Sequence, residues 1–77
     1  ISTVSPNISS LNKNDVEIIL QLMPNKRYSN LIKYRYVEDK SNEETAKLLG
    51  LTMDIYYNKH KLAKEQFTKT LRKEGLA

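Results

Sequence analysis

The sequence predicts an all-α fold, a four-helix helix-turn-helix domain whose last helix is long. Three observations lead to this prediction. Apolar residues recur at helical spacing from Asn12 onward. Gly50 stands between two such segments, at a place where a left-handed residue commonly ends a helix. No stretch alternates polar and apolar residues as a half-buried strand does, and no repeat or low-complexity tract occurs.

Residues 1–10 (ISTVSPNISS) are serine-rich, contain Pro6 and show no periodicity. This composition predicts a linker or disordered N-terminus, with the domain covering residues 11–77. Because the chain begins at Ile1 rather than at methionine, we expect it to be one domain of a longer protein.

The first helix is predicted to begin at the N-cap Asn12 and to end before Pro24. One face carries the apolar side chains at i, i+3, i+4 and i+7, namely Val16, Ile19, Leu20 and Met23. Ile18 and Leu22 lie on the opposite side. This second apolar face is either packed between neighbouring helices or receives a partner protein.

The second helix is predicted from about Lys26 to Val37, and residues 38–40 form a polar link to the third. Its apolar face carries Tyr28, Leu31, Ile32 and Tyr36. Ser41 followed three residues later by Glu44 forms a capping box, in which the hydroxyl accepts from the Glu44 backbone N–H and the carboxylate can reach the Ser41 N–H.

The third and fourth helices meet at Leu49-Gly50-Leu51, and Thr52 offers a hydroxyl N-cap for the fourth. The fourth is predicted from about Met53 to Lys73, with a core stripe of Tyr56, His60, Ala63, Phe67 and Leu71. Two helices joined by a short turn that contains glycine form a helix-turn-helix. The second helix of that motif can lie in the major groove of DNA.

Composition excludes several classes of protein. The net charge of the 77 residues is +4, and the basic excess grows towards the C-terminus, where a polyanion can bind. The absence of cysteine excludes a disulfide framework and a thiolate metal site, and it fits the reducing cytoplasm that we expect for this protein. No apolar run is long enough to span a membrane, so we expect no membrane partner.

Catalysis finds no support in the sequence. His60 is the single histidine, and its spacing places it on the core stripe without a serine or cysteine nucleophile. No phosphate-binding loop, calcium-binding loop or metal-ligand spacing occurs, so we expect neither an enzyme nor a cofactor.

The stretch Met23–Phe67 resembles the C-terminal DNA-binding region (region 4) of bacterial sigma factors of the sigma-70 family, in particular the extracytoplasmic-function type. That family has a Leu-Pro opening, a helix ending in Leu-Arg-Tyr, a Ser cap with Glu-Glu-hydrophobic-Ala, and Leu-Gly-Leu-Ser before a basic recognition helix. The matching residues here are Met23-Pro24, Tyr34-Arg35-Tyr36, Glu38, Ser41, Glu43-Glu44, Ala46, Leu49-Gly50-Leu51-Thr52, Lys59 and Ala63.

The resemblance implies a transcription-initiation protein of the winged-helix-like DNA-binding superfamily. Such a domain recognises the −35 element of double-stranded promoter DNA, docks on the β flap of core RNA polymerase and can bind an anti-sigma factor. The positions implied to contact DNA are Arg35, Thr52, Tyr57, Asn58, Lys59, Lys61, Leu62 and Lys64. Asn can bond adenine, Lys can bond guanine or phosphate, and Tyr can bond phosphate or touch a thymine methyl. Ile18 and Leu22 are the candidate surface for polymerase or an anti-sigma factor.

Some residues depart from the family pattern. Asp54 replaces a common Gly, Tyr57 a common Lys or Arg, Leu62 a frequent Arg, and Thr45 and His60 occupy usually apolar positions. Two alternatives therefore stay open. One is a stand-alone transcriptional regulator with the same module, and the other is a helical protein-interaction domain that has lost DNA binding.

Overall fold

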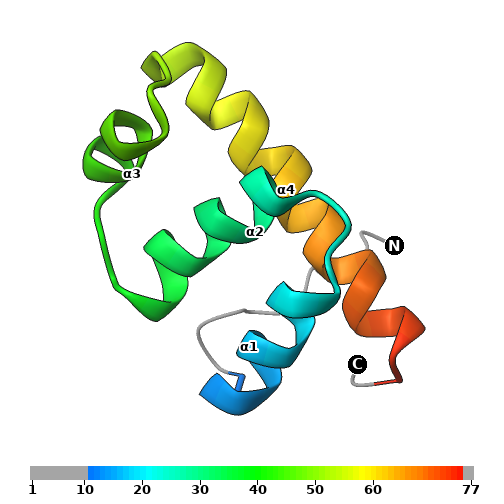
Figure 1. Cartoon of the computed structure of the whole chain (residues 1–77). Helices are drawn as coiled ribbons and strands as arrows, with labels where there is room; N and C mark the ends of the chain where they lie inside the picture. Colours follow the sequence, from blue (N-terminus) through cyan, green and yellow to red (C-terminus); the bar gives the residue numbers. More distant parts are fainter. Residues whose placement is uncertain (1–10, 76–77) are drawn as a thin grey trace, which may run out of the picture.

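The structure is a computed structural model that describes residues 11–75. Its elements are α1 (Lys13–Leu22), α2 (Lys26–Ile32), the short π-helix η2 (Lys33–Val37), α3 (Asn42–Leu49) and α4 (Met53–Lys73) (Figure 1). The part of the chain that the structure describes contains no strand, so the predicted all-α class with four helices is confirmed. The predicted linker 1–10 lies outside the described residues.

The helix α4 is the longest element, and the other helices are arranged along it. In Figure 1, α2 crosses the middle of α4, α1 lies beside α2, and α3 lies next to the N-terminal part of α4. All four helices contribute to one core. Its fully or almost fully buried apolar side chains are Val16, Ile19, Leu20, Met23, Leu31, Ile32, Ala46, Tyr56, Ala63, Phe67 and Leu71. The core stripe predicted on α4 is confirmed except at His60, which is half-buried.

The predicted helix starts are confirmed by their capping hydrogen bonds. The Asn12 side chain accepts from the Asn14 N–H at 2.8 Å, and Ser41 Oγ accepts from the Glu44 N–H at 3.1 Å. The Glu44 carboxylate meets the Ser41 hydroxyl, which lies 3.4 Å from Oε1. The predicted return contact was to the Ser41 backbone N–H. The first turn of α3 is thus capped as predicted, with a different partner for its carboxylate.

The second helix extends to Val37 as predicted, but its last turn is a π-helix. The Glu38 N–H donates to the Lys33 carbonyl at 3.0 Å, which spans five residues where an α-helix spans four. This wider turn is accompanied by one tertiary and one local contact: Tyr36 reaches His60 of α4, and the Arg35 guanidinium donates to the Lys40 carbonyl. Helical periodicity alone cannot show a turn that depends on such contacts.

The turn between α3 and α4 has the predicted geometry. Gly50 adopts the left-handed conformation, with φ 70° and ψ 33°. The Leu51 N–H donates to the Ala46 carbonyl at 2.9 Å, and the Gly50 N–H donates to the Lys47 carbonyl at 3.1 Å. These two hydrogen bonds form a Schellman motif, which satisfies the last carbonyls of α3 and fixes the direction in which the chain leaves it.

We expect Gly50→Ala to lower the free energy of unfolding by about 1 kcal/mol, because a Cβ is strained in the left-handed region. A Cβ built at Gly50 would meet nothing within 4 Å, so the backbone conformation alone accounts for the loss. Urea unfolding measures it. Gly50→Asn is the control, since asparagine tolerates this conformation, and it should recover part of the stability. Equal stability of the alanine variant and the parent would contradict the expectation.

Candidate nucleic-acid interface

Six of the predicted contact residues lie in the first twelve residues of α4. Successive side chains of an α-helix are about 100° apart, and Tyr56, Ala63 and Phe67 mark the fully buried side. Asn58 lies opposite that side and is exposed. Lys61 and Leu62 lie on either side of Asn58, so the three form the centre of the outward face.

The other predicted residues of α4 lie on its two flanks. Tyr57 and the half-buried Lys64 share one flank, and the half-buried Lys59 lies on the other, about 140° or more from both. A helix in a major groove has base edges in front of it and phosphates on both walls. The observed distribution therefore allows Asn58 to face base edges while lysines on opposite flanks face phosphates of the two strands.

The charges of this face are free to bind a polyanion. Across residues 11–75 the single ion pair joins Lys40 and Glu38 at 3.7 Å, and it lies in the link before α3. The lysines of α4 therefore have no carboxylate partner among the described residues. Asp54 is the acidic residue in the first turn of α4, where it interacts favourably with the helix dipole but opposes a nearby phosphate.

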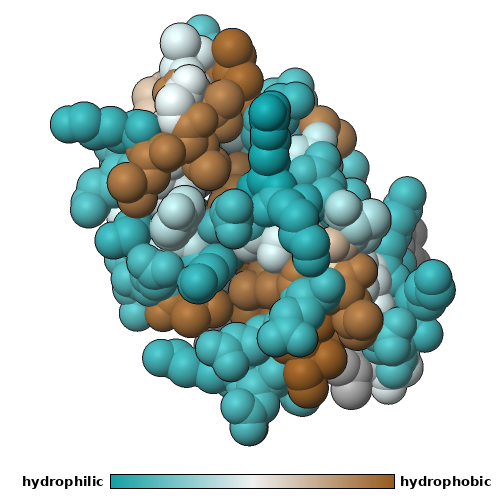
Figure 2. All heavy atoms as spheres, viewed as in Figure 1, coloured by the Kyte–Doolittle hydropathy of each residue, from teal (hydrophilic) through white to brown (hydrophobic). Residues whose placement is uncertain are grey.

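Apolar side chains adjoin the charged face. Figure 2 shows apolar surface over the end of α3 and the start of α4. Leu48 is 56% exposed, Ile55 48% and Tyr57 52%. The Tyr57 ring packs edge-on against the buried Tyr56 ring, with the ring centroids 5.4 Å apart, so its position on the surface is defined. Sequence reasoning missed Ile55 as a candidate contact.

Thr52 has the predicted structural role at the start of α4. Its hydroxyl oxygen accepts from the Ile55 N–H at 3.5 Å, which is a long N-cap hydrogen bond. The residue is exposed, so its hydroxyl hydrogen remains available to an acceptor such as a phosphate oxygen.

Arg35 is the one predicted contact residue outside the α4 region, and its side chain is engaged within the protein. The guanidinium donates to the Lys40 carbonyl and lies 5.4 Å from the centroid of the Tyr36 ring. Its Nε is buried and has no hydrogen-bond partner among the described residues. Arg35 thus links η2 to the segment before α3, and its guanidinium is at least partly engaged within the protein.

An aromatic and polar cluster joins η2, α3 and α4 behind the outward face. The His60 ring lies nearly parallel to the rings of both Tyr36 and Tyr56, with centroid distances of 6.1 and 5.6 Å. Tyr36 Oη and His60 Nε2 lie 3.1 Å apart, a hydrogen bond in which the imidazole tautomer decides the donor. The Tyr56 hydroxyl donates to the Asn42 side-chain oxygen at 2.6 Å. This cluster fixes the first turns of α3 and α4 relative to each other.

Burial lowers the pKa of His60, and the positive charges of Lys64 on α4 and Arg35 on η2 lower it further. The unfolded chain therefore binds a proton near pH 6.5 more readily than the folded domain does. We expect the free energy of unfolding to be highest above about pH 6.5 and to fall as the pH decreases below it. Urea unfolding at pH 7.5 and at pH 5.5 measures this difference.

The control for this prediction is His60→Gln, which removes the only histidine of the sequence and keeps a polar side chain. The pH dependence between these two values should then largely disappear. An equally steep dependence in the variant would contradict the assignment to His60.

The candidate partner residues lie on the side of α1 that faces away from the core. Ile18 is 48% exposed and Leu22 47%, and one helical turn separates them. Leu22 also lines a groove against the last turns of α4, but among residues 11–75 neither side chain is enclosed between neighbouring helices, so the first of the two interpretations from the sequence is wrong for the described residues. The two exposed side chains are accessible to a partner protein. Exposed apolar pairs are also common on monomeric proteins.

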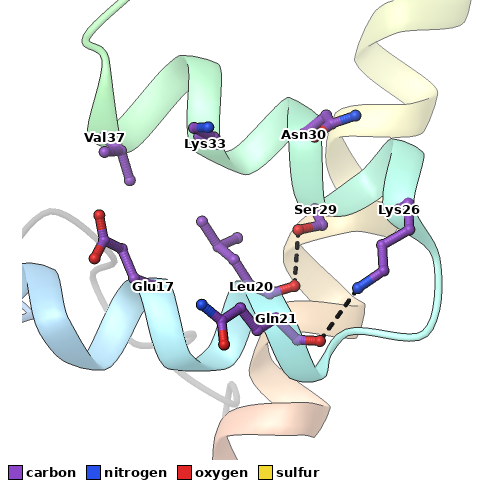
Figure 3. A pocket seen from close by; sticks show the side chains of 8 residues that line it. All are labelled: Glu17, Leu20, Gln21, Lys26, Ser29, Asn30, Lys33 and Val37. Carbon is purple, nitrogen blue, oxygen red and sulfur yellow. Dashed lines mark hydrogen bonds between the residues drawn. The ribbon is translucent and has the colours of Figure 1, made fainter.

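A groove of about 370 Å³ lies between α1 and α2 (Figure 3). The Ser29 hydroxyl donates to the Leu20 carbonyl at 2.8 Å, and the Lys26 ammonium donates to the Gln21 carbonyl at 3.2 Å. These two bonds satisfy carbonyls in the last turn of α1, where the helix has no partners of its own. The groove is therefore a largely polar contact between two helices, in which the Ser29 hydroxyl and the Lys26 ammonium are bonded to carbonyls of α1.

No protein-family model, curated protein or solved structure matches this chain. Among the described residues, no helix combines the length and apolar character needed to cross a membrane.

Proposed function

We propose that this chain is a DNA-binding domain of a bacterial sigma factor, of the region 4 type. It recognises the −35 promoter element with α4 and docks on core RNA polymerase in the cytoplasm, without catalysing a reaction. The observation that supports this most is the α3–turn–α4 unit, whose second helix exposes Asn58 and Lys61 on the side opposite the core. The resemblance of Met23–Phe67 to region 4 agrees with it.

The packing of α3 on α4 supports a helix-turn-helix. The inner side of the unit is formed by Thr45, Ala46 and Tyr56, which are 0 to 2% exposed. Thr45 is tolerated there because its hydroxyl donates to the Ser41 carbonyl at 2.8 Å. With the inner side buried and the turn at Gly50 fixed, α4 presents one constant outward face, as recognition in a groove requires.

The proposal is tested by measuring the affinity of this chain for fluorescently labelled DNA duplexes by anisotropy. Promoter-like and scrambled duplexes are compared at two salt concentrations with the parent and Asn58→Ala. We expect affinity to fall steeply with salt, because lysines on α4 release counterions from phosphates. Asn58→Ala should reduce the preference for the promoter-like duplex by about tenfold, as expected for the loss of one bidentate base contact. Absence of binding at low salt would refute DNA recognition by this chain.

We further propose that Ile18 and Leu22 bind the β flap of core polymerase, and that an anti-sigma factor would compete for them. The double variant Ile18→Asp and Leu22→Asp should weaken polymerase binding at least tenfold, because it places two charges in an apolar contact. Co-purification with core polymerase measures this. The control is Asn14→Asp with Gln21→Asp, which adds the same charge to exposed positions of α1. Undiminished binding by the first variant would remove these residues from the interface.

The protein-interaction alternative has two observations in its favour. Arg35 is engaged by the Lys40 carbonyl, and the exposed Asp54 brings negative charge to the start of α4. Both reduce the attraction for phosphate. Under this alternative, binding to polymerase would depend on Ile18 and Leu22, while no duplex would be bound at any salt concentration.

A further inference from the structure

The outward face of α4 carries a stripe of Ile55, Asn58 and Leu62, spaced i, i+3 and i+7. At about 100° per residue the three side chains fall within an arc of about 60°. Ile55 is 48% exposed although it is a large apolar residue, and Leu62 is half-buried. The Asn58 side chain makes no hydrogen bond with any described residue. Along the helix axis, the amide of Asn58 therefore lies between two apolar side chains, Ile55 and Leu62.

This order of side chains matches the chemistry of A·T base pairs in the major groove. Adenine presents an acceptor and a donor that an asparagine amide can bond together, and thymine presents a C5 methyl group that apolar side chains contact. No other base pair of DNA exposes an apolar group there. Guanine acceptors favour Arg or Lys, and the lysine nearest to Asn58 on this face, Lys61, lies about 60° from Asn58 and about 100° or more from Leu62 and Ile55.

The length of the stripe fits a short run of base pairs. The eight residues from Ile55 to Leu62 are separated by seven helical rises and extend about 10.5 Å along the helix axis. Base pairs stack at about 3.4 Å, so the stripe spans roughly three steps. The lysines beside it, Lys59 and Lys61, can bind phosphates, which contribute affinity but no sequence preference. Sequence preference then depends on the three residues of the stripe.

We propose that α4 recognises an A·T-rich element in which Asn58 bonds an adenine and Ile55 and Leu62 contact the methyl groups of neighbouring thymines. This inference rests on the proposed DNA-binding function and adds the class of base sequence and the role of Ile55. It explains why Ile55 stays exposed on a helix whose opposite side has a complete apolar core.

The test uses a duplex that the chain itself selects from a pool with randomised positions. We expect the selected duplexes to be A·T-rich. The selected duplex is then synthesised again with uracil in place of thymine, which keeps pairing and charge and removes only the methyl groups. Affinity for the uracil duplex should be about threefold to tenfold lower for each contacted methyl, as burial of one such group predicts.

The variant Ile55→Ala tests whether Ile55 contacts the thymine methyl groups. It should lower affinity for the thymine duplex, shrink the difference between the thymine and uracil duplexes, and leave the salt dependence unchanged, because it removes no charge. The control is Leu48→Ala, which truncates an exposed leucine outside the stripe and should keep the full difference.

The failures of the two proposals are distinguishable. Salt-dependent duplex binding with equal affinity for thymine and uracil duplexes would overturn the methyl contacts and leave DNA binding intact. Selection of G·C-rich duplexes, or an unchanged thymine preference in Ile55→Ala, would overturn the assigned roles in the same way. Absence of binding to every duplex at low salt would overturn both proposals.

Discussion

Phe67→Ala is expected to lower the free energy of unfolding by about 3–5 kcal/mol, as truncation of a buried aromatic side chain does. Phe67 is 0% exposed in the core stripe of α4, where it belongs to the cluster that all four helices share. A domain of this size buries only about 60% of its unfolded surface and is correspondingly marginal. Small domains at the low end of the range have a free energy of unfolding of about 5 kcal/mol. The expected loss is therefore comparable with the total stability of such a domain.

Urea unfolding followed by circular dichroism measures this loss. The matched control is Leu48→Ala, because Leu48 is a large apolar residue that is 56% exposed and leaves no cavity when it is truncated. The control should change stability by less than about 0.5 kcal/mol. Equal effects of the two substitutions would mean that the side of α4 carrying Phe67 is not the core.

The double charge reversal Lys61→Glu and Lys64→Glu is expected to weaken duplex binding by about 100-fold at low salt and to reduce the salt dependence. Both lysines lie within the first twelve residues of α4, and no described carboxylate pairs with them. Reversal replaces two attractions to phosphate with two repulsions, and about one counterion fewer is released for each lost contact. Anisotropy titrations at two salt concentrations measure both effects.

The control reverses Lys69 and Lys73, which lie on the last turns of the same helix. It changes the net charge by the same amount, so any general effect of charge appears equally in both variants. The control should bind several times more tightly than Lys61→Glu with Lys64→Glu. Equal weakening would indicate that only net charge matters, and that the outward face at Asn58 is not the interface.

The sequence predicted the helices and their ends well because these depend on local chemistry. Asn12, Ser41 and Thr52 cap helices through their own side chains, and Gly50 takes the left-handed conformation that few other residues adopt without strain. The apolar spacing in α1 and α4 identified the core residues for the same reason. Whether the outward face of α4 binds DNA stays a prediction.

Features that depend on contacts between distant residues could not be predicted in this way. The π-helical turn η2 accompanies the contact of Tyr36 with His60, which lie 24 residues apart in the sequence. Arg35 was assigned to DNA by position along the chain, and its bond to the Lys40 carbonyl depends on how the link to α3 folds back. Tyr56 and Asn42 meet through the packing of α3 on α4.

The π-helical turn also affects how the fold would respond to the deletion of one residue. Its hydrogen bond from Glu38 to the Lys33 carbonyl encloses one residue more than an α-helical bond. Deleting one residue between Lys33 and Val37 would restore an ordinary α-helical turn and leave the later residues in nearly the same register. A deletion inside α4 would instead rotate every later side chain by about 100° and move its core stripe off the core. The end of the second helix is therefore the position at which loss of one residue disturbs the helical register least, and the contact of Tyr36 with His60 is the one that such a loss would displace.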